Sequence, residues 1–442
     1  AEAVARQALA LVQAGRFRRA LASAGRARRL AEGGPSALAT ARRAEGIALA
    51  RQGRETEAIP ALRRALAVAR RDGDSATEAE VLQVLASCED RLGRPREARE
   101  SLLAAVEILR RERGGEATPD ARELKALVGL AVLESRAGAL DRAAEILEEV
   151  RRAAAERGSL DIQQSALSRL ASVAIDGGRL DAAMRLAEQA ADLALYLGDP
   201  NLVLVGRARL ADARIRCGRA GEAAALLQRT LDAPLDRVEP ENADYARMLL
   251  ADAWMESGGA RDEAVATLLS GCLERCRKRG KKRPRMMALA VEMERRARPA
   301  CPDPFEPVAA EYERVAGEPG ADPEPEIRVR AGLAVASRRL AIGDARGAVE
   351  AAESAASAAR RAGHPAFEAR ARAALAEALS RAGREGDARE AIAEAGALLD
   401  RAAARIEDPG IREGFLGRAV YEPLAREREA AASGEQRRLA AL

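Results

Sequence analysis

A stretch of 14 residues recurs through this chain at a spacing near 40 residues, and it constrains the fold more than any other feature. LASCEDRLGRPREA begins at Leu85, LASVAIDGGRLDAA at Leu170 and LADARIRCGRAGEA at Leu210. In each copy a Leu precedes a Gly by eight residues, and an Ala follows that Gly by five. The pattern predicts the end of one helix, a Gly turn and the start of a second helix.

The turn glycines extend this register along most of the chain. They are Gly15, Gly53, Gly93, Gly138, Gly178, Gly218, Gly258, Gly343 and Gly383. The gap of 85 residues between Gly258 and Gly343 is about twice the usual spacing, so it contains one degenerate repeat. We therefore predict an all-α, right-handed superhelical α-solenoid of about ten antiparallel helical hairpins, closed by a C-terminal capping helix.

Small residues mark the packing face of the second helix in each hairpin. Ala stands five residues after the turn Gly and often again seven residues later, as at Ala20 and Ala27 or Ala183 and Ala190. This spacing keeps both residues on one helix face and lets neighbouring helices approach closely. Aromatic residues make up only 2% of the chain, which also disfavours sheet.

The repeat spacing divides the chain into four segments. The first segment, residues 1–298, holds repeats one to seven and the first helix of the degenerate eighth repeat. The second, residues 299–325, is a Pro-rich joint with the rest of that repeat. Repeats nine and ten occupy residues 326–400, and the capping helix and tail occupy residues 401–442. In the degenerate repeat we expect helices over residues 285–298 and 305–315. Pro299, Pro302 and Pro304 replace the usual Gly turn between them.

Composition excludes several classes of protein. The net charge is only +4, so the whole chain is not a polyanion binder. The five Cys have no disulfide-like spacing, which indicates a reducing, cytoplasmic setting. No apolar run is long enough to span a membrane, so we expect no membrane partner. The chain begins at Ala1 inside a helical pattern, and we expect it to be part of a longer protein.

The recurring residues resemble the tetratricopeptide repeat. That family places a Leu–small pair in the first helix, here Leu85-Ala86 and Leu210-Ala211, then the turn Gly and two Ala in the second helix. The segment 404–425 is similar to the end of repeat arrays in large bacterial signalling proteins, through Asp408, Pro409, Arg412, Phe415 and Leu416. We interpret it as a cap in which Phe415, Leu416 and Tyr421 cover the last hairpin.

The resemblance implies that the first helices line a concave groove that binds a protein or peptide. Counting back from each turn Gly gives groove candidates in the fourth to seventh hairpins and just before them. They are Arg91, Lys125, Arg136, Asp176, Asp212, Arg216, Tyr245 and Met248. Charges of both signs would line this surface, and Tyr is a common interface anchor.

A basic run from 275 to 285 is the strongest local charge signal. Its basic residues are Arg275, Arg277, Lys278, Arg279, Lys281, Lys282, Arg283 and Arg285. The run could contact an acidic protein surface or nucleic-acid phosphates. Because no aromatic residues interleave for base stacking, we favour a solvated linker and do not expect nucleic-acid binding.

No residue pattern predicts catalysis, a cofactor or a metal. His364, the single His, lies in a Gly-His-Pro connector where we expect a solvated side chain. Cys272 and Cys276 are too few ligands for a metal, so we expect buried thiols. We predict a non-catalytic interaction scaffold or regulatory segment of a larger bacterial signalling protein, which other domains of the same polypeptide could also contact. The alternatives are an effector-sensing domain of a transcription activator, or an appendage of an enzyme.

Overall fold

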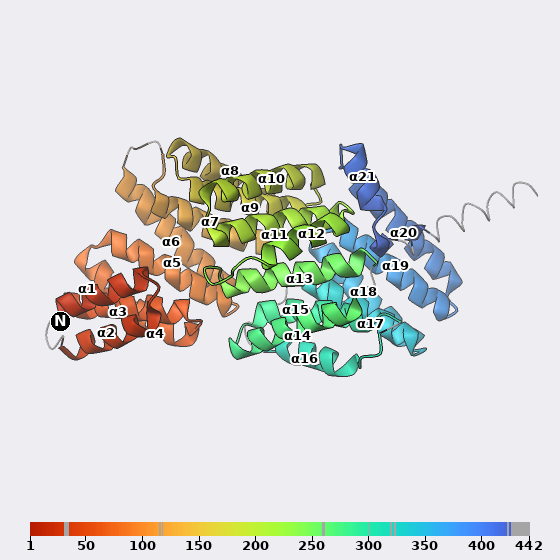
Figure 1. Ribbon diagram of the computed structural model, residues 1–442, viewed down its shortest axis with the longest axis horizontal. Coiled ribbons are helices and arrows are strands. Elements are labelled where there is room, and N and C mark those ends of the chain that lie inside the picture. The colour runs from red at the N-terminus through yellow and green to blue at the C-terminus, as the bar shows by residue number, and fades with distance from the viewer. Residues whose placement is uncertain are drawn as a thin grey trace, which may run out of the picture. The chain divides into compact units, whose positions relative to one another are not determined.

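The computed structural model is an array of antiparallel helix pairs (Figure 1). It describes residues 1–30, 35–114, 116, 118–258, 261–299, 301–318, 321, 324–421 and 424–425. Those residues form 21 α-helices and one 3-10 helix, and none of them lies in a strand. The predicted all-α fold of consecutive hairpins is therefore confirmed. The handedness of the superhelix stays a prediction.

The first twenty helices form ten hairpins in chain order. Hairpins one to five are α1 (Glu2–Gln13) and α2 (Phe17–Leu30), α3 (Pro35–Arg51) and α4 (Glu55–Asp72), α5 (Ser75–Arg91) and α6 (Pro95–Arg113), α7 (Ala121–Arg136) and α8 (Leu140–Glu156), and α9 (Leu160–Asp176) and α10 (Leu180–Leu197). Hairpins six to ten are α11 (Pro200–Arg216) and α12 (Ala220–Leu231), α13 (Pro240–Glu256) and α14 (Asp262–Lys278), α15 (Lys282–Arg296) and α16 (Glu306–Ala316), α17 (Pro325–Ala341) and α18 (Ala345–Arg361), and α19 (Pro365–Arg381) and α20 (Glu385–Ala403). The degenerate repeat is thus a real hairpin, with a short second helix.

The turn glycines have the conformation that only Gly adopts without strain. All nine have positive φ angles, between +69° and +83°. At Gly178 the backbone N–H groups of Gly178 and Arg179 donate to the carbonyls of Ile175 and Ala174 at 3.0 and 2.8 Å. These bonds satisfy carbonyls that the end of a helix leaves without partners, so the Gly ends one helix and aims the next.

The predicted alanines lie at helix contacts. Ala20, Ala58, Ala98, Ala183 and Ala348, each five residues after a turn Gly, have no exposed surface. Close approach of helices at these points replaces the thick aromatic core of an ordinary globular domain.

The chain divides into two compact units. Unit 1 comprises Ala1–Ala166 with Pro319–Asp322, and unit 2 comprises Leu167–Glu318 with Pro323–Leu442. The division into repeat blocks drawn from the sequence rests on periodicity rather than contacts, and it stays a prediction.

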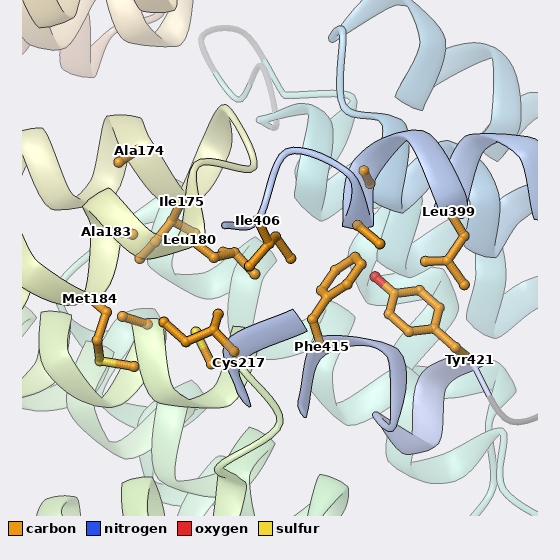
Figure 2. Close-up of a cluster of buried hydrophobic side chains, with 14 of the residues drawn as sticks. Ala174, Ile175, Leu180, Ala183, Met184, Cys217, Leu399, Ile406, Phe415 and Tyr421 are labelled. Carbon is orange, nitrogen blue, oxygen red and sulfur yellow. The ribbon is translucent and has the colours of Figure 1, made fainter. Parts of the chain in front are cut away.

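A closing segment, residues 406–421, follows the last hairpin of unit 2. It contains α21 (Pro409–Leu416) and the 3-10 helix η1 (Ala419–Tyr421). Phe415 and Tyr421 are buried, but Leu416 is 39% exposed, so the expectation that Leu416 covers the last hairpin is wrong. Figure 2 shows Phe415 and Tyr421 beside Leu399 of α20, with Leu180 and Cys217 in the same cluster. The segment therefore covers hairpins five and six as well as hairpin ten.

Polar contacts fasten the closing segment to these earlier hairpins. The Asp181 carboxylate accepts hydrogen bonds from the backbone N–H groups of Glu407 and Asp408 at 2.9 and 3.0 Å. Arg418 donates to both carboxylate oxygens of Glu256, at the end of α13, at 2.6 and 2.9 Å. Unit 2 is thereby closed between its last hairpin and hairpins five to seven.

The tightest contact of the closing segment joins two glycines. A Cβ atom added to Gly218 would lie 2.0 Å from the carbonyl oxygen of Gly414, and one added to Gly414 would lie 2.2 Å from that of Cys217. The two backbones touch directly, and only Gly fits on either side.

Candidate functional site

The first helices of hairpins six to nine carry an ion-pair network that connects helices far apart in the sequence. Arg216 of α11 donates to Glu326 of α17 at 2.6 Å, although the two residues are 110 positions apart. Arg330 of α17 donates to both oxygens of Asp252 on α13, at 2.7 and 2.5 Å, and also pairs with Glu294 of α15. We call these residues, with Asp212 and Tyr245, the inner network of unit 2.

Asp212 and Tyr245, both predicted groove residues, belong to this network. The Tyr245 hydroxyl donates to Asp212 at 3.1 Å and accepts from Arg209 at 2.7 Å. Asp212 also accepts from Arg216 at 3.3 Å. Burial opposes ionisation of Glu326, yet the charges of Arg216 and Arg330 lower its pKa to about 2. Glu326 is therefore charged at neutral pH, and hydrogen bonds and ion pairs join the members of the network to one another.

Asp176, at the end of α9, differs from its neighbours. It forms no ion pair or side-chain hydrogen bond with the residues that the structure describes. Burial, together with the negative charges of Glu326 and Asp212, raises the pKa of Asp176 to about 7. A half-buried carboxylate beside other carboxylates favours a cation or a hydrogen-bond donor from a ligand.

A cavity of about 30 Å³ lies under the closing segment. Its walls come from the α9–α10 turn, the start of α19, the end of α20 and the closing segment. Its charged and titratable wall residues are Arg216, His364, Arg370, Arg405, Arg418 and Tyr421; Phe367, Ile406 and Phe415 are among the apolar ones. No Asp or Glu belongs to this wall, but Arg216, Arg370 and Arg418 pair with Glu326, Glu294 and Glu256 outside it.

His364 is not the solvated connector residue that the sequence suggested. It is the N-cap of α19, its ring lies 4.3 Å from that of Phe367, and its Nδ1 atom is buried without a hydrogen-bond partner among the described residues. Burial and the nearby charge of Arg216 lower its pKa to about 4. The imidazole is therefore neutral at physiological pH.

Three predicted groove residues belong to unit 1. Arg91 donates to the Ala50 carbonyl and pairs with Glu55, and Arg136 pairs with Asp90. Lys125 is exposed on α7. Only Asp176, Asp212, Arg216 and Tyr245 are brought together by the structure, all within unit 2.

Met248 is also in unit 2 but cannot offer contact area to a partner. Its side chain is only 2% exposed, because it lies on the packed face of α13.

The basic run forms ion pairs with carboxylates and is not a solvated linker. Arg275 and Arg279 both pair with Asp244, and Arg277 and Arg285 both pair with Glu311. Further pairs in the run are Lys278 with Glu274, Lys281 with Glu241 and Lys282 with Glu318. Most of the run lies in α14 and α15, and carboxylates of neighbouring helices neutralise it, which disfavours binding of a polyanion.

The guanidinium of Arg295 already pairs with the carboxylates in a group of potential metal ligands. Asp262, Cys301 and Asp303 place one ligand atom each within 4.8 Å of one another. Arg295, which is 1% exposed, donates to Asp262 at 2.6 Å and pairs with Asp303. The positive charge of Arg295 therefore satisfies these carboxylates. The buried thiols expected at Cys272 and Cys276 are found.

Sequence reasoning missed several members of the inner network and of the cavity. Arg330 precedes the turn residue Gly343 by 13 residues, as Lys125 precedes Gly138 and Tyr245 precedes Gly258, so the repeat register contained its signal. Arg418 and Glu294 had no such signal. Arg418 follows the last repeat, and Glu294 lies in the degenerate repeat, which has no turn Gly.

Comparison with known proteins finds a tetratricopeptide-repeat match in the sequence and similar solenoids among solved structures. The tetratricopeptide-repeat family profile matches residues 36–111, and the fold is a TPR-type α-solenoid. The apo form of the quorum sensor NprR from B. thuringiensis is similar, with a TM-score of 0.55 and 16% identity over 71% of this chain and 85% of that one.

Two peptide complexes are similar as well. A Rap protein complexed with Competence and Sporulation Factor has a TM-score of 0.57 and 10% identity, over 83% of this chain and 99% of that one. The Rap conjugation gene regulator of plasmid pLS20, in complex with the Phr* peptide, has a TM-score of 0.53 and 12% identity, over 67% and 77%. At these identities the likeness is one of fold. No curated protein matches the sequence. None of the described helices is long and apolar enough to cross a membrane.

Proposed function

We propose that this chain is a non-catalytic regulatory domain that binds a peptide or protein segment on the inner network of unit 2. The observation that carries the proposal is the convergence of charged side chains of both signs from α9, α11, α13, α15 and α17. Such a surface selects partners by charge pattern more than by contact area. The fold shared with two peptide complexes supports the proposal.

Binding has to rearrange the network, because its members already pair with one another. A partner that carries a positive group could bind Asp176 directly, since this carboxylate has no ion-pair partner among the described residues. Its other charged groups could then replace Arg216 or Glu326 in their pair, at little net cost if the new hydrogen bonds are equivalent. A cytoplasmic location, in a larger signalling protein, fits this proposal.

A peptide selection tests the proposal. Peptides would be selected from a random display library on the purified chain, and their Kd values measured by fluorescence anisotropy. We expect Asp176→Asn to weaken binding about tenfold, the usual effect of removing one charged partner. The double variant Lys281→Glu with Lys282→Glu serves as the matched control and should bind normally. If only the control variant loses binding, the basic run is the site and the inner network is not.

A further inference from the structure

The cavity under the closing segment has four Arg and the single His of the chain in its wall. Three of these Arg pair with carboxylates outside the wall: Arg216 with Glu326, Arg370 with Glu294 and Arg418 with Glu256. Around the cavity the side chains of Arg216, Arg370, Arg405, Arg418 and His364 converge without any Asp or Glu in the wall. Arg405, exposed two residues after the end of α20, forms no ion pair with a described residue. The charge of Arg405 therefore favours a negative group at this side of the cavity.

Two polar groups of the cavity wall make no hydrogen bond to the described residues, and one of them is fully buried. Tyr421 is 3% exposed, its hydroxyl makes no hydrogen bond there, and Figure 2 shows that hydroxyl directed toward Phe415. Burial raises the pKa of Tyr421, so the phenol stays protonated and can donate. The Nδ1 atom of His364 is buried and unpartnered. A buried polar atom without a partner, such as this Nδ1, is rare in folded proteins, and the ring of His364 lines the same space as Tyr421.

The start of α19 adds backbone donors to this wall. The helix has 17 residues, begins at Pro365 and has no side-chain cap, since His364 makes no hydrogen bond to its first N–H groups. The first turn of a helix carries partial positive charge and favours an anion. Phe367, Phe415 and Ile406 provide apolar wall beside these donors.

We propose that this cavity binds a carboxylate carried on a small apolar group. A volume of about 30 Å³ corresponds to roughly two water molecules, which suits a carboxylate head group held by Arg405, with its apolar part against Phe367 and Phe415. The carboxylate could belong to a free organic acid or to the C-terminus of a peptide. The inference does not depend on partner binding at the inner network.

The single His of the chain makes the test direct, because every His ring signal in an NMR spectrum belongs to His364. Phenylacetate would be titrated into the full chain and the ring resonances recorded. We expect a saturable shift, and a rise of the pKa of His364 from about 4 because a bound anion stabilises the imidazolium. Phenylacetamide, which has the same shape without the charge, should give no shift. Peptides ending in Phe, with free or amidated C-termini, distinguish the two sources.

Two variants provide the matched comparison. Arg405→Ala should weaken phenylacetate binding about fivefold, as expected for one solvent-exposed charged contact. Arg401→Ala, an exposed Arg in the last turn of α20 and outside the cavity wall, should bind normally. Saturation by phenylacetate or by the free-acid peptide alone supports the proposal and identifies the source. Shifts that sodium chloride reproduces, equal binding of phenylacetamide, or no shift from any carboxylate would overturn it.

Discussion

Units 1 and 2 use the same hairpin but connect it differently. In unit 1 ion pairs join hairpins that are adjacent along the chain. Arg91 with Glu55, Arg99 with Glu134 and Arg136 with Asp90 are 36, 35 and 46 residues apart. In unit 2 the corresponding separations reach 78 for Arg330 with Asp252 and 162 for Arg418 with Glu256. The same type of repeat can thus form an array linked by ion pairs between adjacent hairpins, or a unit closed by ion pairs between distant hairpins.

The difference comes from residues outside the repeat pattern. The hairpins of both units share the turn Gly and the buried Ala, so these residues cannot decide between the two arrangements. Closure depends on the segment after the last hairpin and on charged residues of the first helices. If so, variants of the closing contacts should affect stability strongly, and equivalent variants in unit 1 only weakly.

Arg418→Ala should have the largest effect, a loss of about 3–5 kcal/mol in the free energy of unfolding, because it leaves Glu256 buried without its partner. Urea denaturation followed by circular dichroism measures this. Arg384→Ala, which breaks an exposed pair with Asp387 on α20, is the control and should change little. Equal midpoints for the two variants would mean that the closing segment does not stabilise unit 2.

Gly218→Ala should follow, with a loss of about 2–3 kcal/mol, since the added Cβ combines a strained φ angle with a clash against Gly414. Gly258→Ala is the control. Its φ angle is the same, +75°, but its Cβ would meet nothing within 4 Å, so only the strain of about 1 kcal/mol applies. A loss at Gly218 no larger than at Gly258 would show that the two backbones do not touch.

Asp176→Asn should increase stability by about 1–2 kcal/mol at pH 8. The pKa of Asp176 is raised to about 7, above its ordinary value of 3.8, so the folded state disfavours the charged form that dominates at pH 8. As the pH falls from 7 toward 4 the carboxyl is protonated in the folded state, and the advantage of Asn should disappear. Thermal unfolding of both proteins across this pH range checks the sign. A variant less stable at pH 8 would mean that Asp176 is held by a partner.

Arg136→Ala in unit 1 should have the smallest effect, below about 0.5 kcal/mol, because its pair with Asp90 is solvent-exposed. Lys125→Ala on the same helix gives the baseline for an exposed cation. Denaturation midpoints of the two variants should agree within error. A large loss at Arg136 would remove the contrast between the two units.

The fold was predictable because its signals are local. A turn Gly with positive φ, such as Gly178, and an Ala packed at a fixed distance, such as Ala183, both depend on nearby residues only. The site was less predictable, although the register did find Asp212 and Tyr245. Met248 shows one limit, since a residue on a first helix can point to the packed side rather than the inner side.

His364 shows the second limit. Its place in a Gly-His-Pro connector indicates a solvent-exposed turn, yet its ring nitrogen is buried, and the residue shares a cavity wall with Phe415, Arg418 and Tyr421. A contact between residues separated by a long sequence leaves no periodic trace. For the same reason no sequence pattern indicates that Arg418 pairs with Glu256.

The hydrogen bonds from residues 407 and 408 to Asp181 also set an order of events during synthesis. Asp181 leaves the ribosome 226 residues before its partner Glu407, a delay of about 10–45 s at ordinary rates of translation. Hairpins five to nine can fold in that interval, because each needs only its neighbours. Unit 2 therefore exists first as an open array with an uncovered apolar face at Leu180 and Cys217, and a chaperone or a partner has that time to bind it.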